Sequence, residues 1–394
     1  MKVVLKVKSI ILLAIVYVFN FFPIKHNKIF LLSYYGDHFG CNPKYITKYI
    51  LENYPKETFD IVWAFNNPDK NQSLHEFRVV KTMSLQYFYE LCTSRVVITN
   101  FRTTDLYRKR KAQYYIQTWH SSLRLKQIEK DAQDSLPIHY VDMAKKDSIK
   151  CDLLLSGCEY STKIFKNAFW YDGEIFEYGT PRNDFLFQQD AAIKKNILHK
   201  LQLPQDKKII LYAPTFRKKN SLDVYDLNYR KVLQKLEEHF GGEWILLIKL
   251  HPHLVAESEQ LDYGEKVINV SNYDDIQELL YVSDILCTDY SSLMFDFSIT
   301  GRPCFLYVPD LKEYLSNDRK LYFELSELPF VAAQSNEELI DKIVNFNHQQ
   351  YLMELNQFLL FVGSFEQGNA CEQLVKRISK VCYGREEKKV YETA

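Results

Sequence analysis

Apolar residues gather along this chain in short runs, and the stretches between the runs carry apolar and charged positions at helical spacing. Strands that are covered on both faces show continuous apolar runs of this kind, whereas strands with one solvent-exposed face alternate apolar and polar residues. The pattern predicts the α/β class, with parallel sheets built from strand, helix, strand units. The eleven runs are KIFLLSYYG, FDIVWAF, RVVITN, YYIQTWH, CDLLLSG, EIFEYG, KIILYAPTF, EWILLIKLHP, KVINVS, DILCTDYSS and RPCFLYVP.

A charged stretch of helical pattern at residues 187–207, which includes Pro204, separates the first six runs from the last five. The chain has 394 residues, more than one hydrophobic core usually organises, so two domains are expected. We predict two doubly wound, Rossmann-like domains that face a cleft. The predicted limits are a membrane-associating segment at 1–25, domains at 26–195 and 196–385, and a solvated tail at 386–394.

The N-terminal segment departs from this pattern. Three lysines precede an apolar stretch from Ile10 to Pro23 that only Asn20 interrupts, and more basic residues follow. The stretch is shorter than the roughly 20 residues that a spanning helix needs, and it has no small-residue cleavage site. It predicts a helix on the cytoplasmic leaflet, with its lysines drawn to anionic headgroups. A true span and an ordinary buried first helix are the alternatives.

Composition narrows the classes of protein. With 46% hydrophobic and 15% aromatic residues, the chain can bury large cores, which excludes disorder. Fifty basic and fifty acidic residues give a net charge of zero, so anion binding must come from local charge. The eight cysteines are scattered without a CxxC pair, so we expect free thiols in a reducing compartment and no metal site.

Polar residues follow several of the predicted strands. His120 follows the fourth run, Gly179–Asp184 the sixth, Pro214–Arg217 the seventh, His251 the eighth and Asp289–Ser292 the tenth. In doubly wound sheets, ligands bind beyond the carboxyl ends of the strands. We therefore predict that these five loops line one site.

Two histidines are the candidate proton-transfer groups. A neutral imidazole at His120 has the right pKa range to take a proton from an alcohol, and Lys126 or Lys130 lies nearby in sequence for anion binding. His251 precedes Pro252, which holds it in an extended conformation and orients its ring. As an imidazolium it can donate to a phosphate or protonate a leaving group. Each histidine has a structural role as its alternative.

The sequence around residue 290 predicts a strand that ends where a helix begins. Ser291 or Ser292 stands at the expected helix start. Free backbone N–H groups and serine hydroxyls there suit a phosphate or a pyrophosphate. Asp296 lies one turn further and can accept hydrogen bonds from sugar hydroxyls. Plain capping of the helix is the alternative for all three residues.

Further anion donors occupy the other predicted strand ends. Arg182 and Arg217 can match phosphate geometry with two hydrogen bonds each. Thr215 stands beside Arg217, and Lys249 ends the run before His251. Together these residues predict a polyanionic ligand.

Several familiar motifs are missing from the sequence. There is no GxxxxGK[ST], no GxGxxG after a strand and no HExxH. Their absence argues against a P-loop nucleotidase, a dinucleotide oxidoreductase and a zinc protease. The chemistry must then come from histidines and anion donors, and we expect no cofactor.

Five motifs, WHSSLRLKQIEKD, YGTPRND, LYAPTFR, IKLHPH and SDILCTDYSSLMFDF, occur in this order and at these spacings. Together they resemble the CDP-glycerol glycerophosphotransferase family of teichoic acid and related wall or capsule polymer synthesis. The resemblance runs from NKIFLLSYYG to CFLYVPDLKEY, which is most of the chain. It implies a two-domain glycosyltransferase-like fold of the GT-B type. It also implies a peripheral protein at the cytoplasmic membrane face that transfers glycerol phosphate from CDP-glycerol to a polymeric or lipid-linked hydroxyl, releasing CMP.

The resemblance assigns roles to individual residues. His120 corresponds to the catalytic histidine of the first, acceptor-side domain, and His251 corresponds to the second histidine. The family commonly has Gly-Thr-Pro after the first histidine, whereas this chain has Ser121, Ser122 and Leu123. With that departure, ribitol phosphate or another CDP-activated alditol is an alternative donor. The positions matching the family's donor-binding residues are Arg182, Pro214, Thr215, Lys249, Ser291, Ser292 and Asp296, to which we add Ser121, Ser122 and Arg217 as substrate-binding candidates.

Two other functions fit the same predicted fold. One is a GT-B glycosyltransferase that uses a nucleotide sugar to build a surface polysaccharide. The other is a non-enzymatic, membrane-bound scaffold of the assembly machinery. The scaffold predicts that some polar strand-end residues are missing, and none is.

Overall fold

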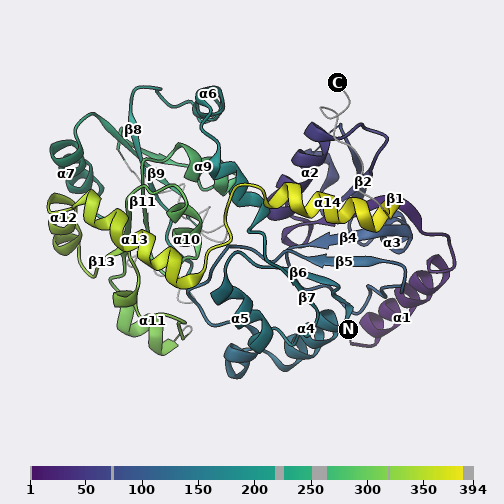
Figure 1. Ribbon diagram of the computed structural model, residues 1–394. Helices are drawn as coiled ribbons and strands as arrows, with labels where there is room; N and C mark the ends of the chain where they lie inside the picture. The colour runs from purple at the N-terminus through teal and green to yellow at the C-terminus, as the bar shows by residue number, and fades with distance from the viewer. Residues whose placement is uncertain (1, 72–74, 218–225, 251–263, 318–319, 385–394) are drawn as a thin grey trace. The chain divides into compact units, whose positions relative to one another are not determined.

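The computed structural model describes residues 2–71, 75–217, 226–250, 264–317 and 320–384 (Figure 1). The chain forms two compact units. Unit 1 comprises residues 1–120, 128–184 and 365–394, and unit 2 comprises residues 121–127 and 185–364. The chain therefore changes unit four times, and a short stretch after residue 120 belongs to unit 2 while its flanks belong to unit 1.

Unit 1 contains a seven-stranded sheet in the order β3-β2-β1-β4-β5-β6-β7. Every neighbouring pair is parallel. The order reverses between β1 and β4, as in doubly wound folds. The strands are β1 Lys25–Leu32, β2 Asp60–Phe65, β3 Arg78–Lys81, β4 Ser94–Thr99, β5 Tyr114–Gln117, β6 Leu153–Leu155 and β7 Glu174–Phe176.

Helices pack on both faces of this sheet (Figure 1). Ile29 and Leu31 of β1 face a core shared with two helices, α2 and α14, while Phe30 faces the other side and its ring contacts Tyr87 of α3. Helix α14 lies far along the chain, yet Leu374 belongs to the same core. The helices of unit 1 are α1 Lys2–Phe19, α2 Cys41–Asn53, α3 Leu85–Thr93, α4 Ile138–Lys150, α5 Glu159–Ala168 and α14 Ala370–Tyr383.

Unit 2 contains a six-stranded parallel sheet in the order β10-β9-β8-β11-β12-β13. Its order also reverses once, between β8 and β11. The strands are β8 Lys208–Tyr212, β9 Trp244–Ile248, β10 Val267–Asn269, β11 Ile285–Thr288, β12 Cys304–Tyr307 and β13 Val331–Ala333. The helices are α6 Ala191–Lys200, α7 Tyr229–Phe240, α9 Ile276–Val282, α10 Leu293–Ser298, α11 Leu311–Asn317, α12 Asn336–Val344 and α13 His348–Val362.

The short stretch 121–127 is attached to unit 2 by backbone hydrogen bonds. The amide of Gln127 donates to the carbonyl of Lys320 over 2.9 Å, and the amide of Tyr322 donates to the carbonyl of Leu125 over 2.7 Å. Leu125 is fully buried, and Leu123 is 3% exposed. The motif that begins at Trp119 is thus divided between the two units.

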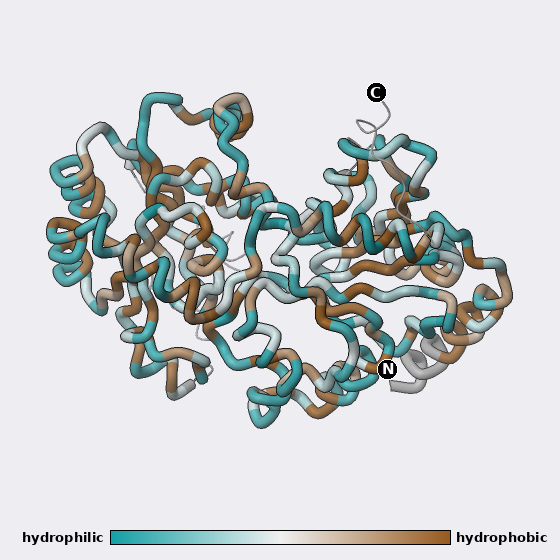
Figure 2. The backbone as a smooth tube through the Cα atoms, viewed as in Figure 1, coloured by the Kyte–Doolittle hydropathy of each residue, from teal (hydrophilic) through white to brown (hydrophobic). Residues whose placement is uncertain are grey.

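The predicted α/β class with two parallel, Rossmann-like sheets is confirmed. Each of the eleven apolar runs coincides with a strand, and the hydropathy colouring in Figure 2 marks many of the strands as apolar. Strands β3 and β13, each at a sheet edge, were not predicted. The division at residue 195 stays a prediction, although by contact the chain enters unit 2 at residue 185 and returns to unit 1 at residue 365.

The N-terminal segment forms helix α1, as its pattern predicted. Val16 is 1% exposed and packs against Phe88 and Cys92 of α3, with Leu12 and Phe19 beside it. Among the described residues, no helix is both long and apolar enough to cross a bilayer.

Candidate active site

Each sheet has one point where the strand order reverses, and polar loops leave the carboxyl ends of the strands there. In unit 1 these loops follow β1 and β4, and in unit 2 they follow β8 and β11. Ligands of doubly wound folds bind at such switch points. The predicted site residues can therefore be examined at two places, one in each unit.

A cavity of about 220 Å³ lies at the switch point of unit 1 and contains two of the predicted residues. His120 and Arg182 both line it. Tyr34 follows β1, and Asn100 follows β4, so the loops at the strand reversal complete the wall. Arg182 is 5% exposed, whereas His120 is exposed. The structure thus brings the candidate base and a buried cation to one cavity.

The ring of His120 is supported by an aromatic contact. It stacks on Trp119 with a centroid separation of 4.8 Å and an interplanar angle of 20°. Trp119 has a φ of 48°, in the left-handed region that tryptophan rarely adopts. Its amide donates to the side chain of Gln117 over 2.9 Å. The orientation of the His120 ring therefore depends on a locally strained backbone.

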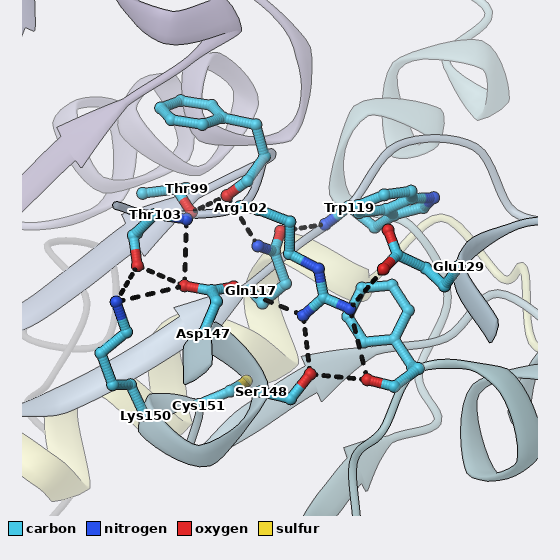
Figure 3. A network of polar contacts seen from close by, with 12 residues as sticks. Thr99, Arg102, Thr103, Gln117, Trp119, Glu129, Asp147, Ser148, Lys150 and Cys151 are labelled. Atoms are coloured by element: carbon cyan, nitrogen blue, oxygen red, sulfur yellow. Dashed lines mark hydrogen bonds and ion pairs between the residues drawn. The ribbon is translucent and has the colours of Figure 1, made fainter. Parts of the chain in front are cut away.

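A buried arginine lies beneath Trp119 (Figure 3). The guanidinium of Arg102 is fully buried, pairs with Glu129 at 3.1 Å and Asp147 at 3.4 Å, and stacks on Phe169. Burial alone would lower the pKa of Arg102, but Glu129 and Asp147 reverse the effect and raise it. This charge is balanced within unit 1, so Arg102 has a supporting role in the cavity wall.

Asn42, which sequence reasoning missed, links the two predicted residues of this cavity. Its side-chain amide donates to the carbonyls of Thr118 and Trp119 over 3.3 and 3.1 Å. Its oxygen accepts the backbone N–H of Arg182 over 3.0 Å. Asn42 is fully buried in the first turn of α2. One side chain therefore fastens the loops after β5 and β7 together, and no sequence signal marks it.

Most of the predicted GTPRND loop serves the C-terminal part of unit 1. Glu366 accepts the backbone N–H of Thr180 and the side-chain amide of Asn183. Asp184 accepts the N–H groups of Cys371 and of its neighbour at the start of α14, and burial raises the pKa of Asp184. Only Arg182 of this loop lines the cavity.

At the switch point of unit 2, the predicted residues are engaged with carboxylates. Asp289, directly after β11, accepts the hydroxyl of Thr215 over 2.6 Å and its backbone N–H over 2.8 Å. The guanidinium of Arg217 pairs with Asp289 at 2.9 Å and with Asp310 at 2.6 Å. It also stacks over Tyr290, and Arg217 is 5% exposed. Burial opposes the charge of Arg217, but the two carboxylates raise its pKa. The charge predicted to bind a phosphate is thus balanced by two acids.

Lys249 follows β9 and points its ammonium group at the loop after β10. It donates to the carbonyls of Ser271 and Tyr273 over 2.7 and 2.5 Å. Burial lowers the pKa of Lys249 to about 8. Lys249 is therefore a cation that changes charge near neutral pH and that an anionic ligand would keep protonated.

Asp296 lies in α10 and is fully buried. Its carboxylate accepts the backbone N–H of Ser122 over 3.3 Å and the Ser122 hydroxyl over 3.4 Å, so two predicted residues meet within unit 2. Ser121 is buried and has a φ of 67°. Ser291 accepts the backbone N–H of Leu293, a capping contact. These contacts give Asp296, Ser122 and Ser291 structural roles beside their predicted ones.

Three predicted residues remain, Ser292, Pro214 and His251. Ser292 precedes α10 and makes no side-chain cap, and Pro214 is buried after β8. His251 lies outside the described residues. In the part of the chain that is described, no three histidine, cysteine, aspartate or glutamate side chains gather as a metal site would require.

Relatives of known name match nearly the whole chain. The teichoic acid poly(glycerol phosphate) polymerase of Bacillus spizizenii is 31% identical over 96% of this chain and 99% of its own length. The polymerase of the same name from Staphylococcus epidermidis is 33% identical over 91% of this chain, but this chain spans only 51% of its length. A solved structure of the wall teichoic acid polymerase TagF, a histidine variant soaked with CDPG, has a TM-score of 0.83 at 31% identity, covering 97% of each chain.

These matches, the two parallel sheets and the histidine-lined cavity at a strand reversal define the class of protein: a two-sheet α/β transferase. The family described as CDP-Glycerol:Poly(glycerophosphate) glycerophosphotransferase matches residues 14–380. The chain belongs to this family.

Proposed function

We propose that this protein transfers glycerol phosphate from CDP-glycerol to a hydroxyl of a polymeric or lipid-linked acceptor, releasing CMP, in the synthesis of a teichoic-acid-like polymer. The observation that carries the proposal is the cavity at the switch point of unit 1, where His120 and Arg182 lie together in a member of the glycerophosphotransferase family. An exposed imidazole beside a buried cation suits a reaction in which an alcohol attacks a phosphate.

In the proposed reaction, His120 accepts the proton of the acceptor hydroxyl while the hydroxyl oxygen attacks the phosphorus that carries glycerol. The bond from that phosphorus to the CMP oxygen breaks, and CMP leaves. Trp119 holds the imidazole by stacking, and Arg182 offers positive charge to a phosphate of the acceptor or donor. General base catalysis of this kind contributes about 10²–10⁴-fold to the rate.

The donor is assigned to unit 2. Lys249, Thr215, Ser291 and Ser292 all follow strands of its sheet, where nucleotides bind in doubly wound folds. We assign His251 to the leaving group, as the resemblance implies. The engaged guanidinium of Arg217 favours a supporting role in the loop over direct contact with the donor.

Release of CMP from CDP-glycerol tests the proposal. We expect CMP release that depends on a glycerol-phosphate primer or a lipid-linked acceptor and that falls with CDP-ribitol, and no acceptor-dependent release of UDP or UMP from UDP-sugars. Equal turnover of UDP-sugars would favour a glycosyltransferase. No acceptor-dependent CMP release from any CDP-alditol would overturn the proposal.

We also propose that the protein works at the cytoplasmic face of the membrane as a peripheral protein, through α1. The face of α1 opposite Val16 is apolar yet exposed: Ile10 is 65% exposed and Tyr17 is 67% exposed, and Phe21 just beyond the helix is 73% exposed. Large exposed apolar faces of this kind mark interaction surfaces. Burying them in the headgroup region of a bilayer would remove them from water.

A basic loop beside the end of α1 supports the same proposal. Residues 108–111 have the sequence RKRK. The side chain of Asn20 donates to the carbonyl of Arg108, and the Arg110 guanidinium donates to the carbonyl of Phe22 over 2.7 Å. Lys109 is paired with Asp152 at 2.7 Å, whereas Arg108 and Lys111 are exposed. Exposed positive charge next to exposed aromatic rings suits anionic headgroups, each such residue contributing about 1 kcal/mol near the surface.

Vesicle binding by point variants tests this membrane contact. The double variant Tyr17→Ser, Phe21→Ser leaves Val16 and its packing on α3 in place. We expect it to bind vesicles of phosphatidylglycerol and phosphatidylcholine about tenfold more weakly or worse. Leu360→Ser on α13, where the side chain is 82% exposed, is the matched control. Unaltered vesicle binding by the double variant would refute the contact.

A further inference from the structure

A second cavity, of about 180 Å³, lies in unit 1 on the α3 side of the sheet. Its walls include Leu32 at the end of β1, Val97 of β4, and Phe88 and Leu91 of α3. Each of these four side chains is at most 7% exposed. The cavity is therefore formed within the fold and lined largely by apolar atoms.

This cavity adjoins the His120 cavity. Tyr35 and Phe101 line both of them, and their rings lie 4.1 Å apart at an angle of 36°. Tyr35 has a φ of 56°, so its backbone is held in a conformation that tyrosine rarely adopts. A ligand that passes these two rings can place one end beside His120 and the other in the apolar cavity.

Three threonine hydroxyls in the walls of the second cavity have partners within the fold. The hydroxyl of Thr82 donates to Asn66, that of Thr99 donates to the carbonyl of Phe101, and that of Thr103 donates to Asp147. The hydroxyl of Tyr107, which also lines the cavity, is buried and has no hydrogen-bond partner among the described residues. The walls therefore offer mostly apolar atoms and one phenolic hydroxyl, which suits an aliphatic chain better than a sugar or a polyol, because most hydroxyls of such a ligand would lack partners.

Three residues that line this cavity also belong to the hydrophobic cluster around Val16 of α1. Phe88 lines the cavity and packs on Val16 of α1, and Tyr87 and Leu106, which line the cavity too, belong to the same cluster. The cavity thus lies behind the helix whose outer face we propose as the membrane contact.

We propose that this apolar cavity binds an aliphatic segment of a lipid-linked acceptor, while the polar end of that acceptor occupies the His120 cavity. The inference rests on the proposed function, which supplies the acceptor. It adds a subsite that selects acceptors by their apolar part and that the donor does not occupy.

A series of n-alkyl phosphates from butyl to dodecyl, used below their critical micelle concentrations, tests the proposal by calorimetry on the full-length protein. We expect binding to strengthen about fourfold with each methylene until the cavity is full, and then to level off. Val97→Phe fills the cavity and moves the plateau to shorter chains. Leu91→Ala enlarges the cavity and moves the plateau to longer chains.

Three controls separate the outcomes. Leu315→Phe, in a different cavity of unit 2, leaves the chain-length profile unchanged, and CDP-glycerol binding is unchanged in all the variants. A profile without a plateau, or a plateau that neither cavity variant moves, overturns the subsite. Acceptor-dependent CMP release by the unaltered protein is measured alongside: no release with an intact plateau refutes the proposed function alone, whereas release with no plateau refutes the subsite alone.

Discussion

The two sheets share one strand order, yet their switch points use arginine in opposite ways. In unit 1, Arg182 lines an open cavity beside His120. In unit 2, Arg217 lies between Asp289 and Asp310 with its charge balanced. Both residues were predicted from the same sequence feature, a basic residue directly after a strand. The difference teaches that position at a strand end selects candidates, and that the packing of the loops decides whether a cation lines a cavity, as Arg182 does, or lies between two carboxylates, as Arg217 does.

The largest effect is expected for His120→Ala, which tests whether the cavity of unit 1 holds the chemistry. Without a general base, transfer should fall about 10²–10⁴-fold, while CDP-glycerol binding stays unchanged. Acceptor-dependent CMP release and calorimetric titration measure the two quantities. His239→Ala is the control, because His239 lies on α7 in contact with the carbonyl of Phe346. Unchanged turnover by His120→Ala would remove this residue from the mechanism.

Replacing each arginine by methionine tests the comparison directly. Arg217→Met leaves Asp289 and Asp310 buried without their guanidinium, so the free energy of unfolding should fall by about 3–5 kcal/mol. Arg182→Met should lower transfer far more than Arg217→Met does, because Arg182 lines the His120 cavity. Urea unfolding measures the free energy of unfolding, and CMP release measures transfer. Equal losses of transfer in the two variants would contradict the division of roles.

Asn42→Ala tests whether Asn42 positions His120 in the cavity of unit 1. Loss of the three hydrogen bonds to the Trp119 and Arg182 loops should misplace His120 and lower kcat about tenfold to a hundredfold, with little change in KM for CDP-glycerol. The pH profile of kcat should shift as well, which a purely structural role would not produce. Asn53→Ala is the matched control on the same helix, where Asn53 donates only to the carbonyl of Tyr49. Parallel losses of kcat and folded protein would refute a positioning role.

The smallest effect is expected from the contribution of Lys249 to the pH dependence of the free energy of unfolding. The pKa of Lys249 is about 8 in the folded protein and about 10.4 in an unfolded chain. Between these values the unfolded chain binds more protons, so stability rises with pH, by about 1 kcal/mol from pH 8 to pH 9. Lys249→Met should lack this rise in urea unfolding. An identical pH dependence in both proteins would show that burial does not lower this pKa.

The fold was largely predictable, because buried parallel strands are visible in the sequence as continuous apolar runs. The three-residue strand Val331–Ala333 could not be found in this way, because two of its three residues are alanine, which is not enriched in strands.

The candidate site was predictable only in part. His120 and Arg182 were found because they follow strands. Asn42 and Asp310 were not found, because their roles come from contacts with residues far away in the sequence. Asn42 contacts Arg182, 140 residues away, and Asp310 contacts Arg217, 93 residues away. Pairings of that kind depend on how the loops pack and leave no local pattern.

The return of the chain to unit 1 has a consequence for how the protein is made. The apolar face of the first sheet is closed by α14, with Leu374, Val375 and Ile378 in its core. A nascent chain cannot complete this core until α14 has left the ribosome, and all of unit 2 has been synthesised by then. Translation arrested near residue 364 would therefore release a chain whose candidate base is present but whose supporting sheet is uncovered.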